Sequence, residues 1–484
     1  MKPKQIALFI VITLAVLAAV CYFFPRKGVE IGSTEITMPP LQEVLQQDSA
    51  AVESPQTPSE ATETDTLLPP AAPEILTPPV VKAQTGTADT DTTVAQAVTA
   101  TADSAEVTDT RTLLARFYAA LGSTDTAAVR VVHYGDSQTE GDRMTMNLRR
   151  GLQKQFGGGG VGLLPLHQTI GMRTVTQTLT INGVKQTAQQ GPKRYLAYGP
   201  KGRRRDNRVY GPMAQVAVMD NNLCRGSEKV IVGLTQSKTE MPRPFTRIVV
   251  YGETDSTVTL PDSTMSYTLR LNRKGDIYGL SLETETGVMV DNIPMRGCAG
   301  TIFTGIDRKM LARYYKKSNT RLIIMQFGGN VMPYTRTQKE IDTYVEKMRR
   351  QIKYIRSCAP EADMLFIGPS DMLTTRNGVK TSYSLLPDMD AALRRMAVEE
   401  GTAYWSLFEA MGGKGGMKHW VSLGLAGSDG VHFTRKGADK AGEMLTMWLL
   451  EGWQEYVKEQ EKVSEPEAET ALGQEPEQDN VQEH

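Results

Sequence analysis

The sequence has few cysteines, and this limits the folds that it can adopt. Four cysteines in 484 residues, none closely spaced with another, exclude a zinc ribbon and a disulfide-dense scaffold. Cys21 lies in an apolar N-terminal run, which leaves Cys224, Cys298 and Cys358 in the rest of the chain. One disulfide among these three is compatible with an oxidising compartment, and the sequence does not select the pair.

Basic residues are almost absent from two long segments. Residues 31–110 contain thirteen acidic residues and one lysine, a net charge of −12, and residues 459–484 carry −8. Residues 1–30 carry +3, so the total of −1 requires +16 between Arg111 and Lys458. The near-neutral chain is therefore a basic body with two acidic arms, which excludes a uniformly acidic solvating protein.

Charged residues are also absent between Ile6 and Phe24, and basic residues flank this run on both sides. Its nineteen residues, broken only by Thr13, are long enough to cross a hydrocarbon core. The apolar run of a cleaved signal peptide is usually shorter, about 7 to 15 residues. We therefore expect residues 1–27 to form an uncleaved signal anchor, a single transmembrane helix, with a cleaved signal peptide as the alternative.

Residues 28–107 contain no aromatic residue and little apolar periodicity, and nine prolines fall between Pro39 and Pro79. Such a segment cannot bury enough apolar surface to offset the entropy lost on ordering. We expect an acidic disordered linker here, and a second acidic disordered tail at residues 459–484.

Strand and helix patterns alternate in the basic body. Short apolar or β-branched runs predict strands at Val129–Tyr134, Val288–Ile293, Arg321–Phe327, Asp363–Ile367 and Thr402–Leu407. Helical patterns occupy Asp142–Phe156, Gln338–Ser357, Asp388–Glu400 and Arg435–Tyr456. This alternation predicts an α/β fold with a parallel sheet and helices on both faces. Ligands of such sheets bind at the carboxyl ends of the strands.

Residues 157–285 have a different pattern, in which seven short strand-like runs, from Thr174–Ile181 to Ile277–Glu283, are separated by turn residues and no helix is predicted. Closely spaced short strands are typical of a β-sandwich. We expect an inserted β-rich module that divides the α/β domain into residues 108–156 and 286–458.

Three predicted strand ends carry polar residues suited to nucleophilic catalysis. They are Gly135-Asp136-Ser137-Gln138, Gly328-Gly329-Asn330, and the segment from Asp429 to His432. A serine at a strand-to-helix turn is exposed near a helix N-terminus. An aspartate three residues before a histidine can share its loop and orient the imidazole towards that serine.

With these blocks in this order, the chain resembles the SGNH (GDSL-like) hydrolases over Arg130–Asp142 and Val288–Leu449. The blocks match the family's nucleophile, asparagine and DxxH blocks. The remaining family block is a glycine after the second strand, which Gly297 fits; the alternative, Gly157 to Gly160, is more simply a flexible junction into the insertion. Gln138 replaces the usual leucine, and Val331 follows Asn330 where aspartate is common, which leaves the subfamily open.

The resemblance implies a flavodoxin-like three-layer fold and a serine esterase mechanism. His432 would accept the proton of Ser137 as it attacks an ester carbonyl, and Asp429 would stabilise the imidazolium. The oxyanion would bind the backbone N–H groups of Ser137 and Gly297 and the side-chain amide of Asn330. The resemblance implies neither a metal nor a cofactor.

Each of these residues also has a structural explanation. Ser137 could cap a helix, Asn330 could belong to a turn, and His432 could be a buried structural histidine. Their joint occurrence favours the catalytic interpretation. Met417 and Trp420, which precede the third block, either line the acyl pocket or cap the sheet edge, and His133 is expected in the core.

A basic stretch in the insertion, from Lys193 to Arg208, contains seven basic residues interleaved with tyrosines. Nucleic-acid binding is one interpretation of such a stretch. A membrane-tethered body outside the cytoplasm favours an anionic glycan, with Tyr198, Arg203, Arg204 and Arg205 as its contacts. A solvated basic loop is the alternative.

The inserted module makes the chain similar to bacterial peptidoglycan O-acetylesterases and related polysaccharide acylesterases. We therefore expect removal of O-acetyl or other short acyl groups from a cell-envelope glycan such as peptidoglycan, by a periplasmic body anchored in the bacterial inner membrane. The alternatives are an O-acetyltransferase with the same triad and a non-catalytic tethered glycan-binding protein.

Overall fold

The computed structural model describes residues 109–168, 170–186, 208–218, 230–272 and 275–462, together with the backbone of three short strands and of one helix as far as Leu472. Compact packing divides the chain into Met1–Thr101 and Ala102–His484. In the first unit the described strands are β1 (Val29–Ile31) and β2 (Thr34–Ile36), an antiparallel pair within the predicted linker. The predicted anchor, residues 1–27, lies outside the described residues. Among the helices that the structure describes, none combines the length and the apolar character that crossing a membrane requires.

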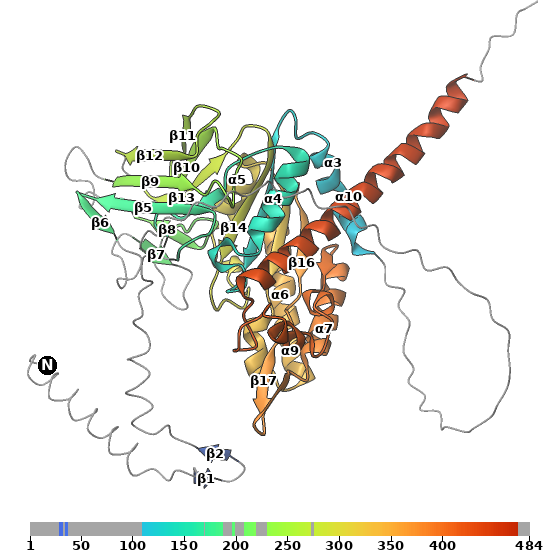
Figure 1. The fold of residues 1–484 in the computed structure, drawn as a ribbon. Coiled ribbons are helices and arrows are strands. Elements are labelled where there is room, and N and C mark those ends of the chain that lie inside the picture. Colours follow the sequence, from blue (N-terminus) through green and yellow to red (C-terminus); the bar gives the residue numbers. More distant parts are fainter. Residues whose placement is uncertain are drawn as a thin grey trace, which may run out of the picture. The chain divides into compact units, whose positions relative to one another are not determined.

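The second unit is built on a five-stranded parallel sheet (Figure 1). Its strands lie in the order β14 (Gly287–Pro294), β3 (Ala128–Gly135), β15 (Thr320–Gln326), β16 (Asp363–Ile367) and β19 (Ala403–Trp405). The first of these strands in the chain, β3, thus lies between the second and the third, which is the flavodoxin-like order. The predicted α/β fold class is confirmed, and the topological switch point lies between β3 and β15.

Helices cover both faces of the sheet, which is why its strands are buried along almost their whole length and are mostly apolar. One face is covered by α3 (Ala115–Leu121), α4 (Thr145–Phe156) and α10 (Arg435–Leu472), and the other by α5 (Arg308–Lys317), α6 (Gln338–Cys358) and α7 (Leu386–Glu399). The apolar stripe of α6, including Met348 and Ile352, packs on Ile323 and Met325 of β15 within one core cluster.

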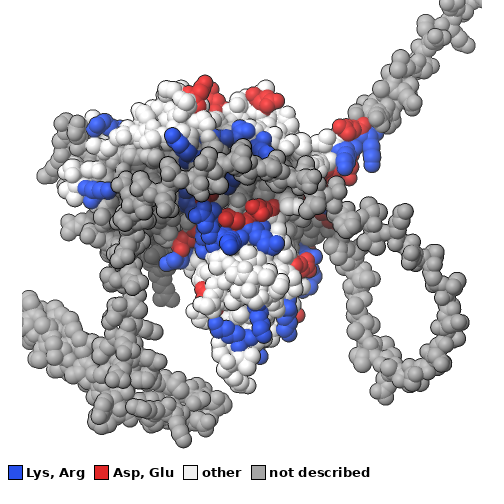
Figure 2. Space-filling view, in the orientation of Figure 1, with Lys and Arg blue, Asp and Glu red and all other residues white. Residues whose placement is uncertain are grey.

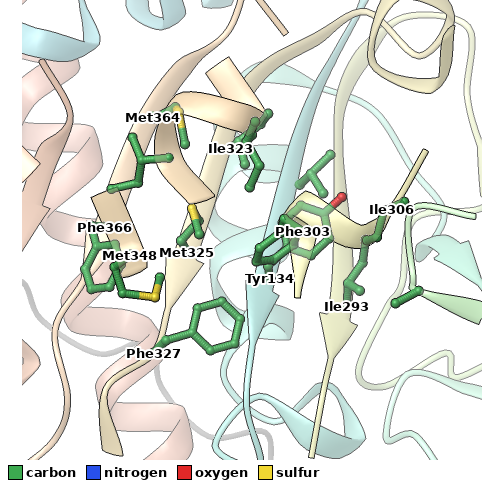
Figure 3. Close-up of a cluster of buried hydrophobic side chains, with 14 of the residues drawn as sticks. Tyr134, Ile293, Phe303, Ile306, Ile323, Met325, Phe327, Met348, Met364 and Phe366 are labelled. Carbon is green, nitrogen blue, oxygen red and sulfur yellow. The ribbon is translucent and has the colours of Figure 1, made fainter. Parts of the chain in front are cut away.

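Aromatic packing in this core supports the end of β3. Figure 3 shows Tyr134, Phe303 and Phe327 together, with the rings of Tyr134 and Phe303 edge to face at 4.9 Å. The hydroxyl groups of Tyr134 and Tyr315 are hydrogen-bonded at 2.8 Å. The backbone three residues before Ser137 is therefore anchored in a rigid, close-packed region.

Two antiparallel sheets form the inserted module, as predicted. One has the order β11 (Ser256–Thr259), β10 (Arg247–Gly252), β13 (Ile277–Glu283), β8 (Gln215–Ala217) and β7 (Leu196–Tyr198), with β4 (Gly162–Leu164) also paired to β13. The other has the order β12 (Ser266–Leu271), β9 (Val230–Gln236), β5 (Val175–Ile181) and β6 (Val184–Gln186). Apolar side chains of both sheets, such as Val232 and Leu280, share one core cluster.

A buried ionic network joins the module to the parallel sheet. The guanidinium of Arg130, on β3, pairs with Asp291 of β14 at 2.6 Å and with Glu283 of β13 in the module. Asp291 also accepts a hydrogen bond from the backbone N–H of Leu163 in β4 at 2.8 Å. All three charged side chains are at most 2% exposed. Because unpaired charges at such depth would be costly, this network favours one arrangement of the module on the sheet.

The glycines at the entry to the module are closely packed, so the expectation of a flexible junction is wrong. Gly158 and Gly160 have φ angles of +95° and +83°. A Cβ atom on Gly158 would lie 2.6 Å from the backbone nitrogen of Val288, and one on Gly160 would lie 2.2 Å from the carbonyl oxygen of Leu282. These positions need glycine because the backbone runs against both sheets.

Two helices differ from their predicted ends. α4 begins at Thr145 and not at Asp142, because Gly141 and Asp142 have φ angles of +69° and +59° and belong to the short 3-10 turn η2 (Glu140–Asp142). α10 extends past its predicted end at Tyr456 to Leu472, and so reaches into the predicted acidic tail. The added residues include five glutamates, two lysines and two alanines, which favour helix.

Candidate active site

The structure brings Ser137, His432 and Asp429 together at the carboxyl end of the parallel sheet. The Ser137 hydroxyl lies 3.0 Å from Nε2 of His432, and Nδ1 of His432 lies 2.7 Å from Oδ2 of Asp429. Ser137 lies two residues after the end of β3, whereas the other two residues lie in the loop before α10. This arrangement has the geometry of a nucleophile, a base and a carboxylate that orients the base.

The loop that carries Asp429 holds its carboxylate in a fixed orientation. Oδ1 of Asp429 accepts hydrogen bonds from the backbone N–H groups of Val431 and His432, at 3.0 and 3.1 Å. Partial burial alone would raise the pKa of Asp429, but these backbone bonds and the bond from the His432 ring outweigh it and lower the pKa. Asp429 is therefore prepared to act as an ionised partner of His432.

Asn330 lies at the end of β15, next to the nucleophile block. Its side-chain amide donates to Oδ2 of Asp136 at 2.8 Å and to the carbonyl oxygen of Cys298 at 3.2 Å. Gly328, two residues earlier, has a φ angle of +124°, and a Cβ atom there would press on Pro369 and Leu393. This glycine lets the chain turn sharply after the strand and brings Asn330 over the edge of the sheet.

Asp136 is a site residue that the sequence did not single out. It is 7% exposed, and its Oδ1 accepts a hydrogen bond from the backbone N–H of Gln138 at 2.9 Å. Burial raises the pKa of Asp136 to about 6, against the opposing effect of that hydrogen bond. The sequence does show an acidic residue next to the predicted nucleophile. Its hydrogen bond to Asn330, however, depends on the pairing of β3 with β15, which the sequence alone does not reveal.

Gly297 lies in the turn after β14, where it has a φ angle of +69° and open space in the direction of a Cβ atom. The next residue, Cys298, provides the carbonyl group that Asn330 binds. Gly297 is thus near the amide with which it is predicted to act, although it is not among the residues that line the catalytic pocket.

A pocket of about 240 Å³ opens over Ser137, Asn330 and His432. Its apolar lining includes Phe327, Pro333, Pro369, Met372 and Val431. The mixture of an apolar wall and convergent polar groups is typical of a small-molecule site. The size and polarity fit a short acyl group.

Two residues clamp the nucleophile block to the histidine loop. The side chain of Gln138 donates to the carbonyl of Val431 at 2.7 Å and accepts from the backbone N–H of Phe433 at 3.3 Å. Arg143 donates to the carbonyl groups of both Ser137 and Phe433. Gln138, which departs from the family's usual leucine, therefore has a positioning role in this chain.

The remaining predicted residues lie elsewhere. His133 is fully buried between Gln326 and Thr145, as expected for a core residue. Met417 and Trp420 belong to the core cluster beneath α10 and do not line the catalytic pocket. Arg203, Arg204 and Arg205, and the side chain of Tyr198, lie outside the described residues, as does Cys224.

Cys298 and Cys358 are both free thiols in the structure. In the described part of the chain, no group of three or more histidine, cysteine, aspartate or glutamate side chains is placed to hold a metal ion.

Comparison with known proteins identifies the fold. No protein-family model matches the chain, and no curated protein sequence matches it. The chain is similar to a solved structure described as a peptidoglycan O-acetylesterase in action, with a TM-score of 0.57, 21% identity, and coverage of 71% of this chain and 96% of that one. Given the flavodoxin-like sheet, the chain has the fold of the SGNH (GDSL-like) hydrolases, as the resemblance predicts.

Two more distant similarities involve only part of the chain. An acetyl xylan esterase has a TM-score of 0.24 and 11% identity, with 33% of this chain and 80% of that one covered. The periplasmic domain of a lipopolysaccharide acetyltransferase from Salmonella ser. Paratyphi A has a TM-score of 0.24 and 14% identity, with 36% and 73% covered.

Proposed function

We propose that this protein is a serine esterase of the SGNH type that removes O-acetyl or other short acyl groups from a cell-envelope glycan. The observation that carries the proposal is the chain of hydrogen bonds from Ser137 through His432 to Asp429, at 3.0 and 2.7 Å, on the floor of an open pocket. A structural histidine would be buried with its ring bonds satisfied inside the core, whereas the His432 side chain is 44% exposed.

In the proposed reaction, Nε2 of His432 takes the proton of the Ser137 hydroxyl as the oxygen attacks the ester carbonyl. The imidazolium that forms is stabilised by the Asp429 carboxylate, and it then donates its proton to the leaving alcohol of the sugar. A water molecule, activated by His432 in the same way, cleaves the acyl-enzyme and releases the acid.

The negative charge on the carbonyl oxygen needs donors in the pocket. We assign these to the backbone N–H groups of Ser137 and Gly297 and to the side-chain amide of Asn330. Because the Asn330 amide donates to Asp136 and to the Cys298 carbonyl in this structure, one of these bonds must yield when the oxyanion forms.

The glycan substrate is supported by the fold similarity to a peptidoglycan O-acetylesterase, which extends over more of the chain than the α/β part alone. Its test is the release of acetate when the full chain is incubated with acetylated peptidoglycan and with another acetylated polysaccharide. Release from the first alone would assign peptidoglycan, and release from the second alone would assign a different glycan.

Transfer to a sugar hydroxyl in place of water is the second candidate function, because the same triad serves both reactions. Adding an unacetylated oligosaccharide acceptor to the assay separates the two: a transferase forms acetylated oligosaccharide, and an esterase forms free acetate.

We also propose that residues 1–27 anchor the protein in the bacterial inner membrane, with the catalytic body in the periplasm. We further propose that Tyr198 and Arg203 to Arg205 contact the glycan.

A further inference from the structure

A second cavity adjoins the catalytic pocket. It has a volume of about 240 Å³ and lies between the short 3-10 helix η4 (Gly329–Tyr334), the strand β17 (Leu373–Arg376) and the start of α7. Tyr383 lines both cavities. The cavities also meet along the chain, because Met332 lines the second cavity and the next two residues, Pro333 and Tyr334, line the catalytic pocket. A polymer bound with one acyl group at Ser137 can therefore extend directly into this second cavity.

Two arginines that form no ion pair at contact distance with any described residue line the second cavity, although the backbone N–H and the charge of Arg336 help to lower the pKa of the nearby Glu340. Arg336 donates to the carbonyl groups of Thr335 and Pro333, at 3.0 and 2.6 Å, and Arg376 approaches the hydroxyl of Ser384 at 3.5 Å. In the described part of the chain, neither guanidinium forms an ion pair, whereas Arg349 pairs with Glu399 and Glu400. Unpaired guanidinium groups that share one concave surface form a site for carboxylates, which they can bind in a bidentate manner.

Two carboxylates, those of Glu340 and Asp388, lie near this cavity, and neither forms an ion pair with Arg336 or Arg376 in the described part of the chain. Both backbone N–H groups at the start of α6, those of Arg336 and Thr337, donate to Glu340, which completes a capping box there. Asp388 lies in the first turn of α7, and the N-cap of that helix, Leu385, lines the cavity and has no side-chain cap. Figure 2 shows Lys and Arg predominating on the lower part of the molecule, where Figure 1 labels β17 and α9 (Gly416–Ser422).

The wall that carries Arg376 is fixed relative to the catalytic histidine. β17 pairs with β18 (Val379–Ser382) in a hairpin whose turn, Asn377-Gly378, has φ angles of +49° and +75°. The backbone N–H of Leu373 donates to the carbonyl of Gly430 at 2.8 Å, two residues before His432. The base of the hairpin that carries Arg376 is therefore tied to the loop of the catalytic histidine.

An exposed aromatic ring lies at the rim of the catalytic pocket, in the same 3-10 helix as Met332 of the second cavity. Tyr334 is 80% exposed and lies at the rim of the catalytic pocket, two residues before Arg336. Large apolar surfaces of this kind are normally buried, and a flat ring beside a polar site is suited to stacking against the face of a sugar.

We propose that this cavity is a subsite for a carboxylate-bearing sugar of the glycan strand, held by Arg336 and Arg376 with its ring against Tyr334. The proposal rests on the proposed glycan esterase function and names its substrate class as an anionic strand. It assigns substrate selection to the described α/β domain, in addition to any contribution from the Lys193–Arg208 stretch.

The test compares two oligosaccharides that differ in the carboxylate. The full chain is titrated calorimetrically with a tetrasaccharide of alternating N-acetylglucosamine and N-acetylmuramic acid, and with chitotetraose, which lacks the lactyl carboxylates. We expect the first to bind about tenfold more tightly, the order of one charge-assisted pair. In the double variant Arg336→Gln, Arg376→Gln, this ratio should fall towards one.

A matched control removes two positive charges elsewhere, through Arg395→Gln and Lys440→Gln, at exposed positions on α7 and α10. The control should keep the parent's ratio. Equal binding of both oligosaccharides by the parent, or an unchanged ratio in the Arg336, Arg376 variant, would overturn the subsite. Binding is measured without turnover, so a parent that discriminates between the probes but hydrolyses no ester would disprove the proposed function and leave the subsite standing.

Discussion

The side-chain amide of Asn330 donates a hydrogen bond of 2.8 Å to the carboxylate of Asp136, the residue immediately before the candidate nucleophile. This bond joins the ends of two neighbouring strands, β3 and β15, across the topological switch point of the sheet. Asp136 therefore couples the orientation of the predicted oxyanion donor to the position of Ser137. Because the carboxylate is buried, the coupling also has a cost in stability that depends on pH.

The first prediction concerns that cost. Asp136 has a pKa of about 6 in the folded protein and 3.8 without burial, so the folded state binds the additional proton between these values. Stability from this group is therefore present at low pH and is lost as pH rises from about 4 to about 6. The substitution Asp136→Asn removes this titration. We expect the unfolding free energy of the variant, relative to the parent, to increase by about 3 kcal/mol between pH 4 and pH 7.

Urea denaturation of both proteins at a series of pH values measures this difference. A difference that stays constant over the range would show that the carboxyl group is not buried as the structure describes. In the same variant, we expect kcat to fall, because an amide side chain has one acceptor oxygen in place of the two that now accept from Asn330 and from the backbone N–H of Gln138.

The second prediction concerns Asn330 itself. In Asn330→Ala, kcat should fall roughly 100- to 1000-fold while KM changes little, because the amide acts on charge that develops only in the transition state. Steady-state kinetics on a small chromogenic ester provide both constants. A loss confined to KM, or shared equally between KM and kcat, would indicate a structural role.

The third prediction is that Ser137, His432 and Asp429 act as one unit. Ser137→Ala and His432→Ala should each reduce kcat by several orders of magnitude, and the double variant should be little worse than either. Circular dichroism should show an unchanged fold, because Ser137 is only half-buried and His432 is 44% exposed. Full activity in His432→Ala would remove the triad assignment.

The fourth prediction tests the attachment of the inserted module. Arg130→Met leaves the buried carboxylates of Glu283 and Asp291 without their cation, so we expect a loss of about 3 to 5 kcal/mol in unfolding free energy. Arg321→Met, which breaks a more exposed pair with Glu361 at 3.4 Å, is the control and should cost no more than about 1 kcal/mol. Similar losses of unfolding free energy in the two variants would mean that the Arg130 network does not specifically stabilise the attachment of the inserted module to the parallel sheet.

The sequence predicted the parallel strands well because each is a short run dominated by β-branched and other apolar residues, as Val129–Tyr134 illustrates. Arg130 and His133 interrupt that run, and both are buried with hydrogen-bond partners. The sequence also predicted that Ser137, Asn330 and His432 share one site, and the structure places all three around one pocket; each follows a recognisable strand end or precedes a helix. Asp136 and Gln138 were missed because their roles are contacts with residues about 190 and 290 positions away, which no local pattern encodes. The same reason applies to the Arg336 and Arg376 cavity, whose two arginines come from separate elements.

Local backbone conformation was the other source of error. Apolar residues recur at helical spacing throughout Asp142–Phe156. The positive φ angles at Gly141 and Asp142 are nevertheless incompatible with an α-helix, so α4 begins only at Thr145. Asp142 is instead buried against Arg149 and Thr174, at 2.6 Å from each, where it links α4 to the module. The predicted position of Ser137 at a helix N-terminus is therefore wrong, because a turn and η2 separate it from α4.

Acetate release by the full chain and by its Ser137→Ala variant tests the central claim most directly. With acetylated peptidoglycan as the substrate, we predict release by the parent and a loss of several orders of magnitude in the variant, at unchanged stability. Equal release by the two proteins would contradict the assignment of Ser137 as the nucleophile. The absence of release by the parent from acetylated peptidoglycan, from other acetylated glycans and from a small acetyl ester would contradict the esterase function.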